Sequence, residues 1–453
     1  MTKVLIITYH WPPAGGPGVQ RVLKFARYLP RFGWDPLILT VSRGEYPARD
    51  ESLSSEIPAQ MEIFKTRSIE PFSLYKRLTG LSEYESIPTA VLAERQGGWK
   101  KKAAHWVRLN LFIPDAKIGW LPFAVSAGKS IIDRYQPAII FSSSPPPVVH
   151  LIAKKLKNKR RLKWVADFRD PWTDIHYYEG QKRLKAAKLI DHRLEFSVLK
   201  TADAVSCISR LDIEHDFSRK IDERKCFNIP NGYDEADFSG LEQVRPPEET
   251  FNLIHLGAVG RERVPHLLIK SIRRLAGEQL ITPVDFTLTF IGKVAAALTD
   301  ACKTYQVEPF IKYIPYLPHK EALKQARTGH ALLLLITQSA MNRRILPGKT
   351  FEYMRLEKPI LALGPEDGEV ARILKETQSG NVIDYKNEEA IYQRLKELIQ
   401  QVRSEEPKQV MDLSRIEKYS RKHLAGELAE LFDRLCHTGS QQAMLQDLTR
   451  GKG

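Results

Sequence analysis

The feature that most constrains the fold of this sequence is a repeated alternation of short apolar runs with amphipathic stretches. Residues 4–8 are mostly apolar, residues 19–32 follow helical spacing, and residues 36–41 are again mostly apolar. Strands and helices that alternate in this way form βαβ units, in which the strands are parallel. The pattern therefore predicts an α/β fold of the Rossmann type.

The same alternation continues through two series of predicted strands. The first series is expected at residues 4–8, 36–41, 61–65, 138–142, 163–168, 204–208 and 226–229, and the second at residues 252–256, 285–291, 312–315, 331–336, 359–363 and 381–383. At 453 residues, the chain exceeds the roughly 250 to 300 residues that one hydrophobic core usually serves. We expect two facing Rossmann-like domains with a deep interdomain cleft, because ligands bind at the carboxyl ends of parallel strands.

The domain boundaries follow from local composition. Residues 241–250 are polar, contain a Pro pair and show no periodicity, so they are predicted to link an N-terminal domain (1–240) to a C-terminal domain (251–412). Residues 413–436 form a helix candidate that is free to pack back on the N-terminal domain, and residues 437–453 are expected to be a flexible tail. Within the first helix, Lys24, Arg27 and Arg31 are predicted to face outward, and Gly33 to end it.

Charge and cysteine content limit the partners and the compartment. The net charge of +15 favours anionic partners, which include phosphates, lipid head groups and nucleic acid, although nucleic-acid binding rests on this charge alone. The four cysteines lie far apart without a zinc or disulfide pattern, which is typical of reduced thiols in a cytoplasmic protein. No run of 18 apolar residues occurs, so membrane contact is expected to be peripheral.

A glycine-rich segment, HWPPAGGPGVQR, follows the first predicted strand. Gly15, Gly16 and Gly18 allow close approach of a ligand, and the amide groups at the start of the next helix are suited to an anion. The segment is neither the dinucleotide-binding GxGxxG pattern nor a P-loop. It indicates a phosphate or sugar site, and the alternative is a turn that only permits tight packing.

The strongest local signal is ILPGKTFEYMRLEKPILAL, at residues 345–363. A Pro-Gly turn precedes a helix predicted to begin near Lys349, where the side chain can meet a diphosphate. Glu352 lies three residues on, on the same helix face, where a carboxylate can accept two hydrogen bonds from a ribose diol. The alternative role for Glu352 is capping of the helix.

This segment resembles the donor site of the retaining glycosyltransferases of family 4, which have the two-Rossmann GT-B fold. The stretches YHWPPAGGPGVQRVLKFARYL, SSSPPPVVHLIAKKL, WVADFRDPW and NIPNGYDEADF are similar to a branch of that family that builds polysaccharides and other cell-surface glycans. The resemblance implies a hexosyltransferase-type enzyme. It would transfer a sugar from a nucleotide diphosphate sugar, its co-substrate, to a glycan or lipid-linked acceptor, without a further cofactor.

The resemblance also implies roles for single residues on the donor side. Lys349, with either Arg261 or Arg263, would grip the donor diphosphate, and Glu352 would bind the ribose. From the opposite wall, the glycines of the first loop would face the donor phosphates or the transferred sugar. Arg21 would add charge there, or would pair with a surface acid.

One position departs from the family pattern. The family often has two glutamates separated by seven residues, the first of which contacts the transferred sugar, but Arg344 occupies the first position here. The arginine would recognise an acidic sugar, or it would be a solvated loop residue.

Catalytic and acceptor candidates come from VADFRDPWTD and from the first loop. Asp167, Arg169 and Asp170 lie at a predicted strand end, where Asp170 would accept the proton of the acceptor hydroxyl. The alternative is an Asp–Arg pair that only shapes the loop. His10 is a second candidate, with packing as its alternative role. Lys349 would stabilise the charge that develops on the diphosphate, and with no DxD cluster in view, we expect no metal.

A basic and aromatic insertion, residues 98–125, contains Lys100, Lys101 and Lys102 beside several tryptophans. Such a composition suits a segment that lies on anionic lipid at the inner face of the cell membrane, and the alternative is an insertion packed on its own domain. The competing functions are a sugar-nucleotide epimerase or a phosphorylase of the same fold, and a non-catalytic nucleotide-binding partner in glycan assembly.

Overall fold

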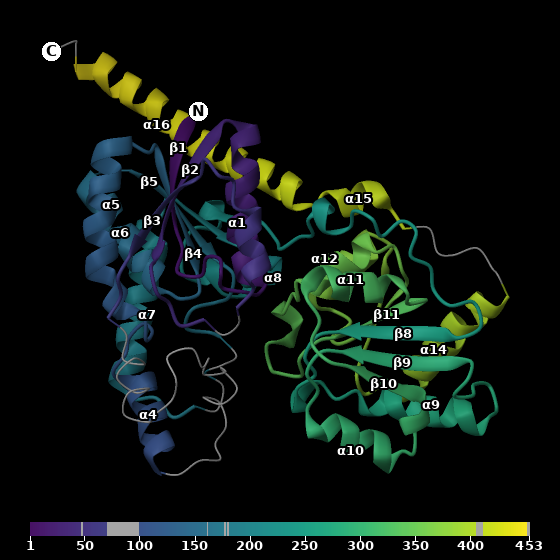
Figure 1. Ribbon diagram of the computed structural model, residues 1–453. Coiled ribbons are helices and arrows are strands. Elements are labelled where there is room, and N and C mark those ends of the chain that lie inside the picture. Colours follow the sequence, from purple (N-terminus) through teal and green to yellow (C-terminus); the bar gives the residue numbers. More distant parts are fainter. Residues whose placement is uncertain are drawn as a thin grey trace. The chain divides into compact units, whose positions relative to one another are not determined.

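The computed structural model describes residues 1–46, 49–69, 99–160, 162–175, 178, 181–404 and 411–450, without the side chains of residues 17, 99–104, 159 and 438–450. It divides into two compact units, residues 1–230 with 421–453, and residues 231–420 (Figure 1). Each unit has its own parallel sheet with helices on its faces. Every strand predicted from the sequence overlaps an observed strand, which confirms two α/β units.

The first unit contains a seven-stranded sheet in the order β3-β2-β1-β4-β5-β6-β7, with every strand pair parallel. The strands are β1 (Thr2–Ile7), β2 (Trp34–Val41), β3 (Glu62–Thr66), β4 (Ile139–Ser144), β5 (Lys163–Phe168), β6 (Ala204–Cys207) and β7 (Cys226–Asn228). The α-helices are α1 (Pro17–Tyr28), α4 (Trp99–Asn110), α5 (Leu121–Tyr135), α6 (Val148–Arg160), α7 (Lys185–Thr201), α8 (Arg210–His215) and α16 (Arg421–Arg450).

Helix α1 forms largely as its pattern predicts. Its apolar stripe, which includes Val22 and Leu23, is fully buried against the sheet. A short 3-10 turn follows, and Gly33 ends it in the left-handed conformation, at φ 85°, where its N–H bonds to the carbonyls of the turn. Lys24 corrects the prediction that it faces outward, because it is buried and its ammonium lies 2.5 Å from the carboxylate of Glu56.

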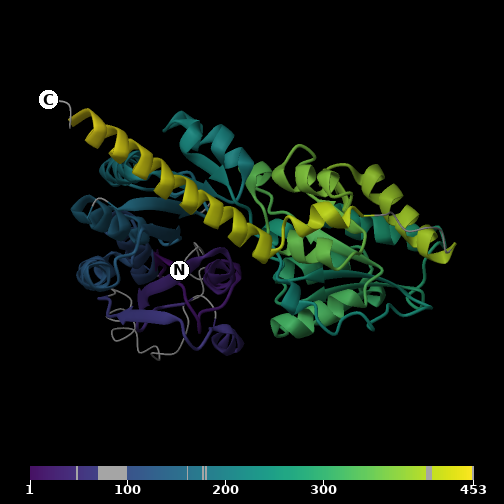
Figure 2. The ribbon, with the colours of Figure 1, turned by 90° about the horizontal axis from the view of Figure 1, so that it is seen from above.

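The predicted helix 413–436 is interrupted. Helix α15 (Leu413–Glu417) belongs to the second unit, and α16 belongs to the first and continues past residue 436 to Arg450. Phe432 of α16 packs on Trp34 at a ring distance of 5.2 Å, and the indole N–H of Trp34 donates to Asp433 over 3.1 Å. Figure 2 shows α16 running along the first unit. The C-terminal helix therefore completes the core of the N-terminal unit.

The second unit contains a six-stranded parallel sheet in the order β10-β9-β8-β11-β12-β13. The strands are β8 (Phe251–Leu256), β9 (Phe286–Ile291), β10 (Ile311–Ile314), β11 (Ala331–Leu335), β12 (Ile360–Leu363) and β13 (Gly380–Ile383). The other α-helices are α9 (His266–Gly277), α10 (Ala296–Thr304), α11 (His319–Arg327), α12 (Lys349–Arg355), α13 (Glu369–Glu376) and α14 (Glu388–Arg403).

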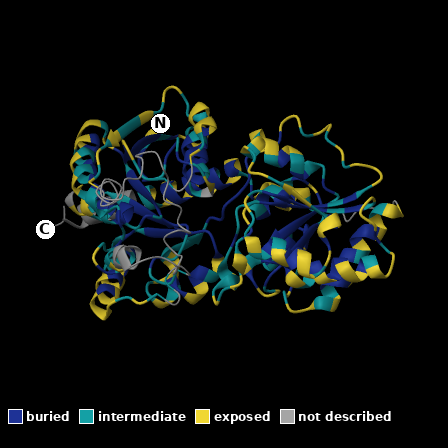
Figure 3. Cartoon of the chain, turned by 60° about the horizontal axis from the view of Figure 1, so that its bottom comes forward, coloured by how far each residue is buried: buried dark blue, intermediate teal, exposed yellow. Residues whose placement is uncertain are grey.

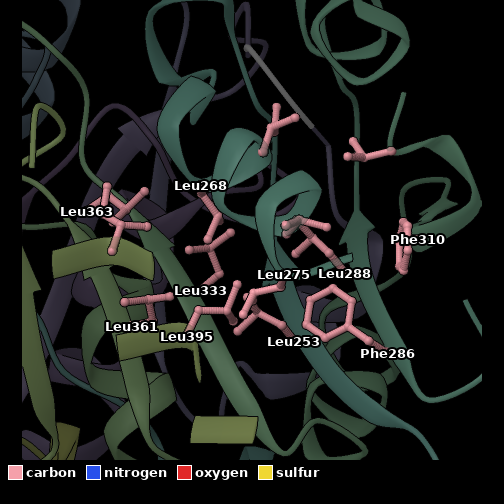
Figure 4. Packing of buried hydrophobic residues seen from close by; sticks show 14 of the residues in the cluster. Leu253, Leu268, Leu275, Phe286, Leu288, Phe310, Leu333, Leu361, Leu363 and Leu395 are labelled. Carbon is pink, nitrogen blue, oxygen red and sulfur yellow. The ribbon is translucent and has the colours of Figure 1, made fainter. Parts of the chain in front are cut away.

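The core of the second unit lies between the sheet and its helices. Leu268 and Leu275 of α9 pack with Leu253 of β8 and Leu395 of α14, all of them fully buried (Figure 4). Buried strands at the centre of each unit and exposed residues on helices and loops are also evident in Figure 3. Strands buried on both faces account for the continuous apolar runs in the sequence.

The boundary between the units falls after Pro230, ahead of the position expected at residue 240. Residues 231–240 join the second unit because Tyr233 and Phe238 are buried in its core, and because the guanidinium of Arg355 bonds to Glu235. A polar-looking segment therefore packs as part of a domain.

Both sheets reverse their strand order at one point. In the first unit the reversal lies between β1 and β4, and in the second between β8 and β11. Ligands of open α/β sheets bind at such a point, outside the carboxyl ends of the strands. The loops that follow these strands are therefore the places to look for a site. Within the described part of the chain, every helix is too short or too polar to cross a bilayer.

Candidate functional site

The loop after β8 is shaped around the side chain of Lys349. Gly257 has a φ of +113°, and a Cβ added there would lie 1.8 Å from Nζ of Lys349. The ammonium thus occupies the space that any other residue at this position would fill. Helix α12 begins at Lys349, which confirms the predicted helix start and brings the cation to the carboxyl end of β8.

The charge of Arg263 affects the ammonium of Lys349. The side chain is half-buried in a short turn after β8, and its Nε donates to the hydroxyl of Thr337, just after β11, over 2.8 Å. Burial lowers the pKa of Lys349 below its usual value; the carboxylate of Glu352 opposes this shift, and the charge of Arg263 adds to it. Arg261 is exposed in the same turn. Of the two arginines left open by the sequence, Arg263 is the one whose charge shifts the Lys349 pKa.

Glu352 is held in place by a histidine from α11. Its carboxylate lies 2.9 Å from Nε2 of His319, whose other ring nitrogen lies 3.9 Å from the carboxylate of Asp237. The Glu352 side chain keeps 16% of its surface exposed, so it remains accessible. His319 comes from a different helix, and no motif in the sequence pointed to it.

Arg344 lies in a short 3-10 turn (Asn342–Arg344) between β11 and α12, and it is half-buried. It therefore stands at the same edge of the sheet as Lys349. A role in recognising an acidic sugar stays a prediction.

In the first unit, the glycine-rich loop leads directly into α1. Gly16 precedes the helix with a φ of +103°, a conformation that favours glycine. Gly18 lies in the first turn, and a Cβ added there would lie 2.0 Å from Nη1 of Arg169. Gly15 packs beside Asp50, where an added Cβ would lie 3.3 Å from the Asp50 Cβ. The missing side chain of Gly18 therefore lets Arg169 lie against the start of α1.

The guanidinium of Arg169 is held by hydrogen bonds at two of its three nitrogens. Its Nε and Nη2 donate to the carbonyls of Ser144 and Pro145, each over 2.7 Å, at the end of β4. Although the residue is only 6% exposed, Nη1 has no hydrogen-bond partner within the part of the chain that the structure describes. Burial lowers its pKa to about 10, which still leaves it charged at neutral pH. An anchored cation with a spare N–H group is suited to an anion or a carbonyl.

His10 completes this edge of the first sheet. Burial lowers its pKa to about 3, and the nearby charges of Arg169 and Lys117 lower it further, so the imidazole is neutral. The ring contacts Tyr9 edge-on at 5.2 Å and Tyr46 at 6.1 Å. These ring contacts agree with the packing role of His10, and its role toward an acceptor stays a prediction.

The family of the first unit follows from its sequence. Residues 15–237 match the model of Glycosyltransferase Family 4, and this range contains Gly15, Gly16, Gly18 and Arg169. The amino-terminal unit belongs to glycosyltransferase family 4. No curated protein matches the sequence of the chain.

Solved glycosyltransferases share the fold of the whole chain. The sucrose-phosphate synthase of Thermosynechococcus elongatus is 13% identical, with 99% of this chain and 100% of that chain covered at a TM-score of 0.54. HepE of Anabaena, in complex with UDP and glucose, is 12% identical, with 98% and 100% covered at 0.52. The lipopolysaccharide outer core galactosyltransferase WaaB is 14% identical, with 96% and 99% covered at 0.57. These likenesses establish the GT-B fold for the chain.

Two predicted site residues of the first unit, Arg21 and Asp167, are buried in its interior. The guanidinium of Arg21 bonds to both carboxylate oxygens of Asp167, over 2.8 and 3.1 Å, and to the carbonyls of Ile229 and Pro230. Both side chains are completely buried. This corrects the expectations that Arg21 adds charge to a donor site and that Asp167 is catalytic, because neither side chain is exposed to a ligand.

The enclosed aspartate is stable as an anion. The hydroxyls of Ser143 and Ser206 donate to Asp167 over 2.7 and 2.8 Å. Burial alone would raise the pKa of Asp167, but Arg21 and these hydroxyls hold it below its usual value. The pair joins α1 to β5 and to the segment after β7. Asp170, in contrast, is half-buried beyond the end of β5 and stays a candidate proton acceptor.

The basic and aromatic insertion is partly packed. Trp120 is completely buried, and its indole N–H donates to the hydroxyl of Thr66 over 2.7 Å. Trp106 and Leu111 of the same stretch are exposed. The side chains of Lys100, Lys101 and Lys102 lie outside the described residues. The second half of the insertion is thus part of the first unit, and the lipid contact expected for the insertion stays a prediction.

Sequence reasoning missed three residues of these sites. Gly257 had a usable signal, because a glycine directly after a buried strand often marks a close approach to the backbone. Thr337 and His319 had none, because their partners Arg263 and Glu352 are distant in the chain.

Proposed function

We propose that this chain is a hexosyltransferase that moves a sugar from a nucleotide diphosphate sugar to a hydroxyl of a glycan or lipid-linked acceptor, with retention. The observation that carries the proposal is the ammonium of the half-buried Lys349, seated over Gly257 at the end of β8 with Arg263 beside it. Two cations at the reversal point of a parallel sheet are suited to a diphosphate.

The chemistry follows from the charge that develops during transfer. As the sugar leaves, the diphosphate gains negative charge, and fixed cations in a partly buried site stabilise that charge strongly. The ammonium of Lys349 has lost solvation on burial, so a bound diphosphate would restore favourable interactions to it. Because lysine and arginine can do this work themselves, we propose transfer that needs no divalent ion.

Glu352 would bind the ribose of the donor. Its carboxylate can accept two hydrogen bonds from a diol, and His319 fixes its orientation from α11. The same helix carries Lys349 one turn earlier. Two of the proposed nucleotide contacts would therefore come from α12, with Arg263 as a third.

The first unit would bind the acceptor. The spare N–H of Arg169 points to the start of α1. A buried N–H without a partner costs free energy, which a bound oxygen would recover. Asp170 is the residue that we propose to accept the proton of the acceptor hydroxyl.

The similar structures suggest which donors to test first. HepE was solved with UDP and glucose, and WaaB is a galactosyltransferase, so UDP-hexoses head the series. We further propose a role in building cell-surface polysaccharide, with the protein in the cytoplasm at the inner face of the membrane. The resemblance of its motifs to that branch of family 4 supports this role.

The first experiment is a thermal-shift screen against UDP, GDP, ADP, CMP and their sugars, because a bound ligand raises the melting temperature. Lys349→Met should weaken binding of the active donor about 10- to 150-fold, since a charge-assisted hydrogen bond contributes roughly 1.5 to 3 kcal/mol. Lys303→Met, on the exposed face of α10, is the matched control and should bind normally. Equal binding by both variants would remove the basis of the proposal.

Turnover assays then separate the competing functions. A transferase consumes donor only with acceptor, whereas an epimerase alters the donor alone, and a non-catalytic partner binds the nucleotide without changing it. Activity that persists in EDTA would support metal independence, and NMR of the product linkage would test retention. Loss of all activity on chelation would contradict metal independence.

A further inference from the structure

Helix α7 in the first unit exposes an unusual number of large apolar side chains. Leu184, which precedes the helix, is 47% exposed, and Leu189, Ile190 and Phe196 are 50%, 47% and 49% exposed. Leu189 and Phe196 are seven residues apart and therefore share one helix face. Large apolar residues that gather on a surface mark interaction sites more often than isolated ones do.

The charges on this face all have one sign. Lys182, Lys185, Lys188, Arg193 and Lys200 are exposed. Within residues 182–200, all of which the structure describes, the only acids are Asp191 and Glu195, and both are buried. We call residues 182–200 with these exposed side chains the α7 surface.

The two acids are turned inward by specific partners. Asp191 accepts from the indole of Trp172 and from Arg183, each over 2.7 Å. Glu195 accepts from the hydroxyl of Thr173 over 2.6 Å and from Lys220 over 2.9 Å. Packing of the helix thus withdraws its negative charge and leaves lysine, arginine and apolar groups outside.

The end of α4 extends this surface. Nε of Arg183 donates to the carbonyl of Leu109, and the backbone N–H of Leu184 donates to the side chain of Asn110 over 2.6 Å. Trp106 and Leu111, near these contacts, are 45% and 64% exposed. Aromatic and aliphatic groups from two elements therefore lie beside the start of α7.

We propose that the α7 surface docks the first unit on an anionic lipid bilayer. Leucine and phenylalanine side chains would enter the boundary between head groups and acyl chains, while the lysines would lie against lipid phosphates. A second copy of the chain fits less well, because two such surfaces would bring like charges together. The main contact is then α7 and the end of α4.

This inference rests on the proposed function only in the need to reach a lipid-linked acceptor. Binding to vesicles is measurable without donor or acceptor, so the two proposals fail separately. Loss of donor binding in Lys349→Met with normal vesicle binding would affect only the transferase proposal. Absence of vesicle binding with normal transfer to a soluble acceptor would affect only the docking proposal.

The experiment is co-sedimentation of the full chain with vesicles. Vesicles of phosphatidylglycerol and phosphatidylcholine in equal amounts should bind it, and phosphatidylcholine alone should bind it weakly. Leu189→Glu with Phe196→Glu should lower the binding constant at least about tenfold, since burial of each such side chain contributes roughly 1.5 kcal/mol or more. Val284→Glu, at an apolar residue 77% exposed in the second unit, is the matched control and should bind normally.

A second variant tests the charges. Lys185→Ala with Lys188→Ala should weaken binding to the anionic vesicles about fivefold per lysine and reduce its sensitivity to salt. Normal melting temperature and UDP binding would verify that the variants fold. Three results would overturn the proposal: no binding by the unmodified chain, unchanged binding by the Leu189 and Phe196 variant, or loss of a dimer in that variant on sedimentation.

Discussion

The substitution Gly18→Ala is a sharp test of the acceptor-side geometry. The added methyl would lie 2.0 Å from Nη1 and 2.6 Å from Cζ of Arg169, far inside van der Waals contact. Gly18 lies in α1 with an ordinary helical backbone, so alanine brings no backbone strain. The guanidinium, although it ends a flexible side chain, is buried and fixed by two hydrogen bonds, so it has to leave its position.

The size of the effect follows from what is broken. Displacement of Arg169 removes its bonds to the carbonyls of Ser144 and Pro145, and hydrogen bonds from a charged donor contribute about 1.5 to 3 kcal/mol each. Alanine in a helix gains roughly 0.5 to 1 kcal/mol over glycine. The free energy of unfolding should therefore fall by about 2 to 5 kcal/mol.

A double-mutant cycle in urea isolates this clash. In an Arg169→Ala background the obstructing side chain is gone, so Gly18→Ala should be neutral or slightly stabilising. Gly277→Ala is the matched control, because it lies at the end of α9 with no atom within 4 Å of the new methyl, and it should stabilise. If Gly18→Ala in the unmodified chain behaves like Gly277→Ala, the proposed contact between Gly18 and Arg169 is refuted.

Further predictions concern the enclosed ion pair and the donor side. Arg21→Met should lower the free energy of unfolding by about 3 to 5 kcal/mol in urea titrations, because Asp167 stays buried without its partner. At acid pH, Asp167 can take up a proton, so the difference between the variant and the unmodified chain should become smaller. An equal difference at acid and neutral pH would contradict this reason. Arg263→Ala should weaken UDP binding in calorimetry by about tenfold or more, and Arg261→Ala only slightly; the opposite order would show that the wrong arginine was chosen. Because the pKa of Lys349 is lowered, the side chain loses its charge at a pH below the usual 10.5. UDP affinity should therefore fall as the pH rises toward 10.5. A UDP affinity that stays constant up to pH 10.5 would contradict this prediction.

Much of the fold could be predicted because its signals are local. The apolar runs of the strands, and the glycines that follow some of them, can each be recognised within a few residues of sequence. Burial on both faces of the sheet fixes the apolar composition of the strands. The start of α12 at Lys349 could also be predicted from the sequence, because a Pro-Gly turn precedes it. The sequence by itself therefore determined the class of fold, the number of sheets and the start of α12.

Tertiary structure decided which side chains meet. Arg21 and Asp167 are 146 residues apart and His319 and Glu352 are 33 apart, and no periodicity predicts such pairs. A buried charge must find its partner wherever the packed chain brings one, so Arg21 became part of the interior while Arg169 kept a spare N–H. In the same way, α16 fills the core of the first unit although it ends the chain, because an apolar face packs where a sheet leaves room.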